Sequence, residues 1–193
     1  MTAKAAVPEK RSARERLLAA AQELFYEEGV NTVGIDRVIE RAGVAKASLY
    51  DCFGSKDELI RAYLESRQIS RQARIMAGVE SCSTPRDKLL AIFEVSGDLF
   101  KDTKYRGCAF LRASAEVKAG SSIKTVCDES RAWLRNLFAH LAEEAGAREP
   151  RKLADQFMML YDGASVAAQM DRKGLAAAAS ARMMAAMLLD AAT

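Results

Sequence analysis

Apolar residues recur in this chain at intervals of three and four positions, which is the spacing of one face of an α-helix. The first such segment runs from Leu17 to Phe25. It is preceded by Ser12 and Glu15 in the S-x-x-E order of a capping box, and Gly29 follows it as a stop signal. The pattern predicts a first helix between Ser12 and Gly29 whose apolar face needs partners.

Two shorter apolar segments come next and provide those partners. Residues 35–42 predict a second helix that ends at Gly43, and residues 49–53 mark a third helix that ends at Gly54. Because glycine tolerates the left-handed backbone that ends a helix, and because Val44 can return to the core, the segment fits a helix-turn-helix. The third helix would then expose side chains small or polar enough to enter a major groove, namely Lys46, Ala47, Ser48 and Asp51. An ordinary helical hairpin predicts the same pattern, so geometry alone leaves DNA binding open.

The remainder of the chain repeats the helical pattern without a strand signal. A second S-x-x-E box at residues 55–58 opens a helix that runs to about Met76. Thr84 and Pro85 supply a cap and a first-turn proline for another helix that runs to about Phe100. Further helices separated by glycines are expected at residues 108–118, 123–145, 150–171 and 175–191. The chain is therefore predicted to be all-α, with about nine helices.

Composition agrees with a folded helical protein but does not name a partner. Of 193 residues, 50% are hydrophobic and 28% charged, which is average globular usage and enough for a core. The net charge of +3 is too small to predict nucleic acid or a membrane surface by itself. The longest apolar stretch, Leu175 to Leu189, is interrupted by Ser180 and Arg182 and is expected to fall short of a membrane span. We therefore expect a cytoplasmic protein without a membrane partner.

The residues that serve catalysis and metal binding are sparse. The four cysteines lack the C-x-x-C spacing of a zinc site or the density of a disulfide-stapled module, and they stand at Cys52, Cys82, Cys108 and Cys127. His140 is the only histidine, so triad catalysis and zinc hydrolysis lack parts. The expectation is a protein that is not an enzyme and has no cofactor and no metal site.

A resemblance to a known family favours DNA binding by the helix-turn-helix. Residues 43–50 read G-V-A-K-A-S-L-Y, and the pattern continues in register with Phe53, Ser55, Lys56, Glu58 and Leu59. This resembles the signature of TetR-family transcriptional regulators, which usually runs A-G-V-S-K-G-T-L-Y-x-x-F-x-S-K-E-E-L. The likeness covers about residues 12–65, while the rest of the chain matches only in the number and length of its helices. It implies a dimeric, repressor-like protein with a ligand-binding C-terminal body.

The chain departs from the family pattern at four positions. Gly34 and Ala45 stand where Ser or Thr often caps the second and third helices, so two side-chain caps are missing. Asp51 stands where the family often has His or Arg against the DNA backbone; an acid there repels phosphate but can accept from a cytosine amino group. Cys52 replaces a common aromatic residue and is interpreted as a small packing residue. These departures bear on the operator sequence and not on the mode of binding.

The expected DNA contacts combine the motif with basic residues that would lie along the same face. They are Arg14, Gly34, Ile35, Arg37, Ala45, Lys46, Ala47, Ser48, Tyr50, Asp51 and Lys56. Lys4, Lys10, Arg11 and Arg16 would add positive charge from the arm and the first turn, and the acids of the domain, Glu23, Glu27, Glu28 and Glu40, can face away from DNA. The alternative, a solvated face without a partner, is the usual meaning of such scattered charge.

The last two predicted helices are apolar on more than one face and need to be covered twice. We expect a homodimer in which these helices pack against their symmetry copies, with interface residues Leu160, Gly163, Ala167, Met183 and Met187. A monomer with a well-buried tail is the alternative. An effector cavity is expected among aromatic and polar residues of the body, namely Phe93, Phe100, Phe110, Arg112, Trp133, Met158, Tyr161 and Asp162. Taken singly, each of these residues also fits plain core.

The sequence thus predicts three parts: an arm at residues 1–11, a helix-turn-helix DNA-binding domain at 12–54, and a ligand-binding and dimerisation domain at 55–193. The predicted function is a TetR-like repressor that binds a palindromic double-stranded DNA operator as a homodimer and is released by a small apolar effector. One rival is a thiol-based redox sensor that uses Cys108 or Cys127 and has no organic ligand. Another is a helical binding protein that never touches DNA.

Overall fold

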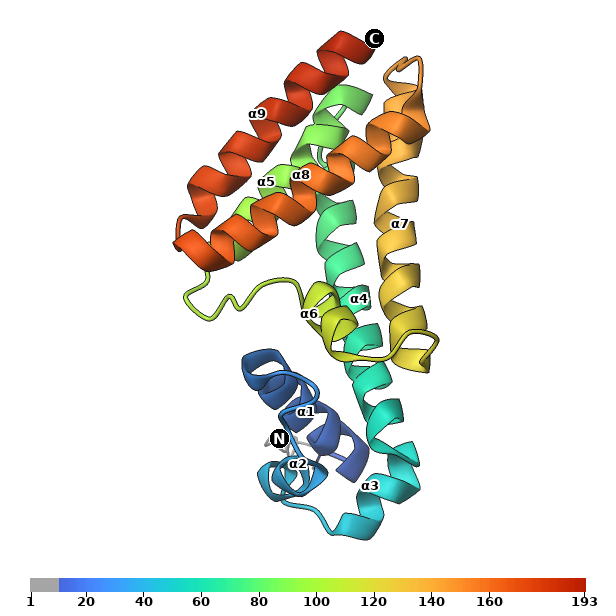
Figure 1. The fold of residues 1–193 in the computed structure, drawn as a ribbon, viewed down its shortest axis with the longest axis vertical. Coiled ribbons are helices and arrows are strands. Elements are labelled where there is room, and N and C mark those ends of the chain that lie inside the picture. The colour runs from blue at the N-terminus through green and yellow to red at the C-terminus, as the bar shows by residue number, and fades with distance from the viewer. Residues whose placement is uncertain (1–10) are drawn as a thin grey trace, which may run out of the picture. The chain divides into compact units, whose positions relative to one another are not determined.

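The computed structural model describes residues 11–193, and across this range the chain is built from helices with no β-strand. Figure 1 shows them in chain order. Their bounds are α1 Ala13–Glu28, α2 Ile35–Ala42, α3 Lys46–Phe53, α4 Lys56–Glu80, α5 Pro85–Phe100, α6 Ala109–Glu116, α7 Ser122–Glu144, α8 Pro150–Asp171 and α9 Gly174–Ala192. The predicted all-α class is confirmed. The predicted arm lies mostly outside the described residues.

The contacts divide the chain into two compact units, which meet between Tyr63 and Leu64. We call the described part of the first unit, residues 11–63, the head, and residues 64–193 the body. The division falls inside α4, whereas the sequence placed the domain boundary just before that helix. Since α4 is one continuous helix, it begins in the head and ends in the body.

The head is held by a small apolar core and by a capped first helix. Leu17, Val38 and Leu49, one from each of α1, α2 and α3, are all fully buried. The capping box that opens α1 is present, since Ser12 Oγ accepts from the backbone N–H of Glu15 at 3.2 Å and the Glu15 carboxylate accepts from the N–H of Ser12 at 2.7 Å. The same interaction lowers the pKa of Glu15. The three short predicted helices therefore share one core, as expected.

The turn between α2 and α3 depends on Gly43. Its backbone is left-handed, with φ 60° and ψ 45°, a conformation in which a Cβ atom costs energy. The N–H of Gly43 donates to the carbonyl of Glu40 at 3.1 Å and that of Val44 to Ile39 at 3.3 Å, which closes the end of α2. The guanidinium of Arg16 donates to the carbonyl oxygens of Ala42 at 3.3 Å and Gly43 at 2.9 Å. The turn is thus fixed from its own backbone and from α1.

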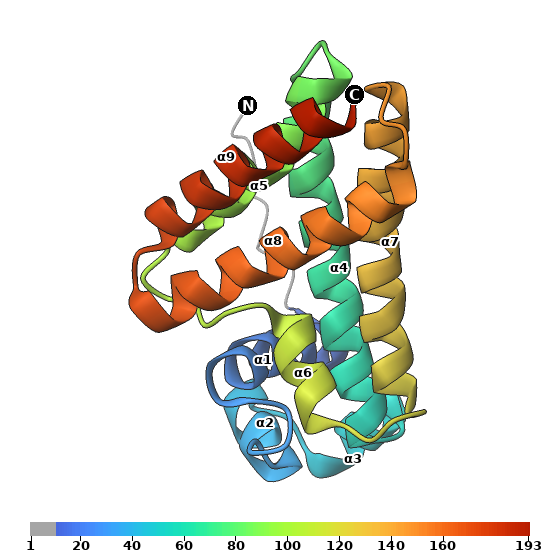
Figure 2. The ribbon, with the colours of Figure 1, turned by 45° about the horizontal axis from the view of Figure 1, so that its top comes forward.

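The body has an aromatic core where α5, α7 and α8 meet. Phe93 and Phe138 stack with ring centroids 5.7 Å apart, Phe157 lies 5.5 Å from Phe138, and Tyr161 lies 6.4 Å from Phe93. In both ribbon views α9 lies along α5 and beside α8 (Figure 1, Figure 2). Burial of large rings on three helices dominates the stability of such a core.

Several predicted helix bounds change in the structure. The helix expected to stop near Met76 continues to Glu80, and α6 covers only Ala109–Glu116 of the predicted 108–118. The proline-started helices α5 and α8 begin at Pro85 and Pro150 as predicted.

α9 corrects one expectation about membranes. It has 19 residues and a mean hydropathy of 1.4, so by length and composition it is long and apolar enough to cross a membrane, contrary to the sequence-based estimate. The helix extends beyond the Leu175–Leu189 stretch at both ends. Such a helix is weak evidence for a membrane, because apolar helices of soluble proteins pass the same test.

Candidate nucleic-acid interface and ligand cavity

α3 has a largely polar outer face and an apolar inner face. Leu49 is fully buried, whereas Tyr50 is 46% exposed and Lys46, Ala47 and Asp51 are exposed. Of the other expected DNA contacts, Arg14, Gly34, Arg37 and Ala45 are exposed, and Ile35, Ser48 and Lys56 are half-buried. All of them lie in the head and are open to some degree, which a DNA-contacting role requires.

Two of the basic side chains expected to face phosphate, Lys46 and Arg37, are engaged by carboxylates in the free protein. Lys46 Nζ lies 3.1 Å from Asp36 Oδ1, and the hydrogen bond raises the pKa of Lys46. Arg37 holds Glu28 through contacts of 2.5 and 2.8 Å, and the pKa of Glu28 is lowered as a result. Glu28 is expected from the sequence to face away from DNA, whereas in the structure its carboxylate lies against Arg37, one of the expected DNA contacts. Because these pairs are exposed, water and salt screen them and phosphate can compete for the cations.

The remaining features of this surface are the positions of Arg14 and Asp51 and the lack of side-chain caps on α2 and α3. The guanidinium carbon of Arg14 lies 5.1 Å from the centre of the Phe53 ring, a cation–π contact that places the arginine at the end of α3. Asp51 takes part in no ion pair among residues 11–193. Gly34 and Ala45 precede α2 and α3 without a side-chain capping bond, as the sequence indicated.

Arg16 has a different role from the one expected. The sequence grouped it with residues that neutralise phosphate, but its guanidinium binds the carbonyl oxygens of the α2–α3 turn. Arg16 therefore positions the recognition helix. Its place on α1, 27 residues before Gly43, gives no local signal of that contact.

A cavity of about 250 Å³ lies within the body and draws on α4, α6, α7 and α8. We call it the body cavity; it is lined by Arg71, Cys108, Phe110, Leu111, Ser114, Lys124, Cys127, Asp128, Arg131, Leu134, Met158, Tyr161 and Asp162. Its mixture of apolar walls and a few polar groups is typical of small-molecule sites, and its volume lies just below their usual range, which suits a small ligand.

The structure brings together half of the expected ligand residues and separates the others. Phe110, Met158, Tyr161 and Asp162 line the body cavity. The other four, Phe93, Phe100, Arg112 and Trp133, are absent from its lining.

The separated aromatics have structural places elsewhere. Phe93 is 1% exposed within the aromatic core. Phe100 packs against Tyr105, with ring centroids 4.9 Å apart. It also contacts the start of α9 so closely that a Cβ on Gly174 would lie 2.7 Å from the Phe100 carbonyl oxygen. Core packing therefore accounts for these two rings.

Sequence reasoning missed Arg71, the only member of α4 that lines the body cavity. Its Nη2 donates to the carbonyl oxygen and the hydroxyl of Ser130, at 2.6 and 2.7 Å, and so joins α4 to α7. Its guanidinium carbon lies 4.7 Å from the centre of the Phe110 ring. No sequence signal marked it, because Arg71 stands in a polar stretch of α4 that also contains Arg67, Gln68 and Gln72.

The two thiols of the redox hypothesis, Cys108 and Cys127, both line the body cavity. Burial raises the pKa of Cys127 to about 11. The nucleophilic form of cysteine is the thiolate, so Cys127 is held in its unreactive form at neutral pH.

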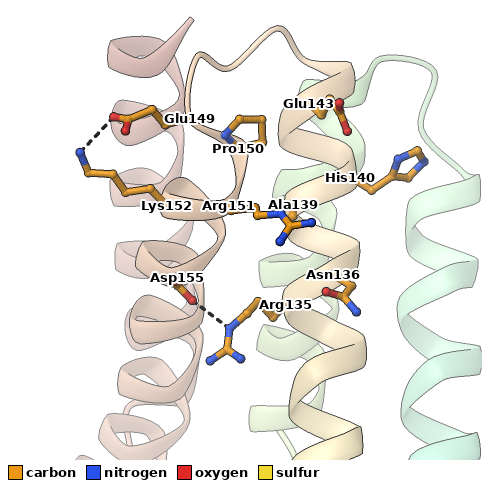
Figure 3. A pocket seen from close by; sticks show the side chains of 10 residues that line it. All are labelled: Arg135, Asn136, Ala139, His140, Glu143, Glu149, Pro150, Arg151, Lys152 and Asp155. Atoms are coloured by element: carbon orange, nitrogen blue, oxygen red, sulfur yellow. Dashed lines mark hydrogen bonds and ion pairs between the residues drawn. The ribbon is translucent and has the colours of Figure 1, made fainter.

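A larger hollow of about 1110 Å³ lies between the end of α7 and the start of α8, and Figure 3 shows its lining. Four of its charged side chains form two ion pairs: Arg135 Nε is 2.8 Å from Asp155 Oδ1, and Lys152 Nζ is 3.0 Å from Glu149 Oε2. All of these side chains except Arg135 belong to exposed residues. The hollow is thus a solvated cleft with compensated charge, and the body cavity is the better candidate for an apolar effector.

The outer sides of α8 and α9 expose large apolar side chains. Met159 and Met170 of α8 are 65% and 76% exposed, and Met183 and Met187 of α9 are 57% and 65% exposed. Between the two helices runs a groove lined by small and apolar residues that include the predicted Leu160, Gly163 and Ala167. A Cβ on Gly163 would meet no atom within 4 Å, so the groove is open there. Exposed apolar surface of this kind often marks an interaction site.

Comparison with known proteins identifies the head. Residues 17–63 match the family model of bacterial regulatory proteins of the tetR family. A solved structure described as a TetR-type transcriptional regulator, sav143 from Streptomyces avermitilis, is 33% identical and superposes with a TM-score of 0.86 over 94% of this chain and 98% of that one. This chain therefore belongs to the TetR family and is a DNA-binding transcriptional regulator. Regulators of this family bind DNA operators and act as dimers.

Two curated relatives differ in the direction of regulation. The transcriptional activator FasR of Mycolicibacterium smegmatis is 33% identical over 88 residues, which are 46% of this chain and 40% of FasR, so the chain spans less than half of that relative. The transcriptional repressor NemR of Escherichia coli is 25% identical over 169 residues, 82% of this chain and 85% of NemR. Both relatives are transcriptional regulators.

Proposed function

We propose that this protein is a cytoplasmic repressor that binds a palindromic operator as a homodimer and leaves it when a small molecule enters the body cavity. The recognition surface is the outer face of α3 with Arg14, Arg37 and Lys56 around it. Phosphate displaces Asp36 from Lys46 and Glu28 from Arg37 as the head docks, because both pairs are exposed and weak. Side chains on α3 then read base edges in the major groove.

The course of α4 is the observation that supports release from the operator by a ligand. The helix begins at Lys56, directly after the recognition helix and Gly54, and Arg71 on the same helix lines the body cavity. A ligand that favours one position of α4 shifts the population toward a spacing of the two recognition helices that no longer matches two half-sites. Loss of that match removes base and phosphate contacts together.

The dimer interface is assigned to the exposed apolar faces of α8 and α9, with Leu160, Gly163, Ala167, Met183 and Met187 at its centre. Small residues in the groove let a second copy approach closely, and the exposed methionines around it supply adaptable apolar contacts. The same interface explains why α9 is apolar enough to pass for a membrane span.

The test of this function is operator binding, measured by fluorescence anisotropy with the DNA that flanks the protein's own gene. Lys46→Ala and Tyr50→Ala are expected to weaken binding by about tenfold or more and to leave the dimer intact. Lys46→Ala should also reduce the slope of log affinity against log salt by about one. The matched control is Lys152→Ala, an exposed lysine of the body that is paired with Glu149 much as Lys46 is with Asp36. Wild-type affinity in both head variants would contradict the placement of the recognition helix.

The direction of regulation needs a separate measurement, because FasR is an activator and NemR a repressor. Expression of a reporter gene under the control of the flanking DNA is expected to rise when the gene for this protein is deleted. A fall on deletion would make the protein an activator and leave its DNA binding as proposed.

The redox alternative is favoured by one observation, the presence of Cys108 and Cys127 in the same cavity. The raised pKa of Cys127 opposes it. Under ligand release, the double variant Cys108→Ser with Cys127→Ser keeps its operator affinity and its response to the effector, and hydrogen peroxide leaves wild-type binding unchanged. A peroxide response that disappears in the double variant would favour the redox alternative.

A further inference from the structure

The charge inside the body cavity is unbalanced. Its lining contains three basic side chains, Arg71, Lys124 and Arg131, but only two acidic ones, Asp128 and Asp162. Lys124 is paired with Asp128, and Arg131 Nη1 lies 2.5 Å from Asp162 Oδ2. Among the residues that the structure describes, Arg71 has no carboxylate partner. The uncompensated positive charge of the cavity is therefore on Arg71.

The neighbours of Arg71 are neutral and hold its guanidinium in place. All of its side-chain hydrogen bonds within residues 11–193 are made by Nη2, to Ser130 and to Gln68 Oε1 at 3.1 Å. The guanidinium also lies over the Phe110 ring and 6.0 Å from the centre of Trp133. Burial keeps Tyr161 and Cys127 neutral by raising the pKa of each, so neither supplies a counter-charge.

Part of this guanidinium lacks any hydrogen-bond partner. Nε of Arg71 is shielded from solvent and makes no hydrogen bond in the described structure, and Nη1 makes none either. A buried donor without an acceptor costs free energy, and more so when it carries charge. Such a group is stabilised by any ligand that brings an anionic oxygen to it.

We propose that the effector of this regulator is a small organic acid whose anionic group binds Arg71 and whose apolar portion lies against Phe110, Leu134 and Met158. The proposal rests on the ligand-released function above and narrows its effector from a largely apolar molecule to an amphipathic anion. A cation would meet the unpaired positive charge of Arg71, and a neutral molecule would leave that charge uncompensated. The volume of about 250 Å³ restricts the acid to a small one.

The position of Arg71 also explains how such an acid acts on DNA binding. An anion that binds the guanidinium of Arg71 competes with Ser130 and Gln68 for its N–H groups. This competition changes the hydrogen bonds that join α4 to α7. Because α4 begins beside the recognition helix, a shift of α4 is transmitted along one helix and needs no further relay.

The experiment compares small acids with their neutral amides on the full-length protein in a reducing buffer. The pairs are phenylacetate with phenylacetamide and hexanoate with hexanamide. Trp133 is the only tryptophan and lies beside Arg71, so its fluorescence reports on the site, and titration calorimetry supplies an independent dissociation constant. At least one acid is expected to bind about tenfold or more tightly than its amide.

Variants at Arg71 assign that preference to one side chain. Arg71→Met keeps the length of the side chain and removes the charge, and it should abolish the preference for acids over amides. Arg71→Lys keeps the charge and should keep the preference for acids, which guards against a loss caused by misfolding of the methionine variant. Arg86→Met is the control, because Arg86 is an arginine of the same body that is paired with Asp190 and is not part of the cavity lining.

Three results would overturn the acid proposal: equal binding of acid and amide, an acid preference that survives in Arg71→Met, or no binding of any acid in the set up to millimolar concentration. In each of these cases specific operator binding by the free protein would still stand, and with it the regulator function. Failure of the free protein to bind its flanking DNA specifically at low salt would instead refute the proposed function, whatever the fluorescence titration shows.

Discussion

The recognition helix α3 and the last helix α9 both turn a large part of their surface outward, but with opposite chemistry. α3 exposes Lys46 and Asp51 and only one large apolar side chain, Tyr50. α9 exposes four large apolar side chains, at Leu175, Met183, Met184 and Met187. A polar face suits a charged partner that is bound and released, whereas an apolar face suits a permanent partner that excludes water. The exposed face of α3 therefore suits DNA, whereas the exposed face of α9 suits a second copy of the chain.

The largest effect is expected from placing charge on the α9 face. The double variant Met183→Lys with Met187→Lys would bury like charges against their copies, so the dimer should dissociate. A monomer engages one half-site only, so operator affinity should fall by about 100-fold or more. Sedimentation and anisotropy measure the two effects, with Ala77→Lys, an exposed position on α4, as control. If the double variant remains a dimer and binds the operator with wild-type affinity, the exposed face of α9 is not the dimer interface.

A second effect concerns how the head holds α3. Gly43→Ala places a side chain at φ 60° and should lower the free energy of unfolding by about 1–2 kcal/mol. Gly34→Ala is the matched control, because Gly34 has an ordinary φ of −77° and its added Cβ would meet nothing within 4 Å. Chemical denaturation of both variants measures the difference. Equal stability of the two would show that the turn does not depend on a left-handed residue.

A smaller effect is expected from restoring a missing cap on the recognition helix. Ala45→Ser places a hydroxyl where it can accept from the first turn of α3, and should stabilise the protein by about 1 kcal/mol. The midpoint of denaturation measures it. The backbone of Ala45, with φ −73° and ψ 152°, already has the extended conformation of a cap. An unchanged midpoint would mean that water already satisfies those N–H groups.

The smallest effect is expected at Asp51. Asp51→Asn removes a negative charge from the face of α3 and should tighten binding to arbitrary DNA by about threefold, with less discrimination between operator and competitor if Asp51 accepts from a cytosine. Competition binding at fixed salt measures both. Asp190→Asn, a carboxylate of the body, serves as control. Weaker binding to arbitrary DNA would show that the carboxylate does not oppose phosphate.

The sequence predicted the position of α3 more completely than the residues of the ligand site. Helix starts depend on residues that are neighbours in the chain, so the capping boxes at Ser12 and Ser55 and the prolines at 85 and 150 marked four helix beginnings. A cavity depends on residues from separate helices. Phe93 and Tyr161 both lie on mostly apolar helices, yet one belongs only to the core and the other also lines the cavity.

The amino-acid sequence by itself determined the helical class, the helix-turn-helix and the surplus of apolar surface at the C-terminal end, because each follows from residue types at fixed short spacings. Only the tertiary structure decided that Arg16 secures the recognition turn, that carboxylates engage Lys46 and Arg37, and that Arg71 is left without a counter-charge. All three depend on residues that are not neighbours in the sequence, because the fold decides which side chains come within a few ångströms of one another and so how their charges are balanced.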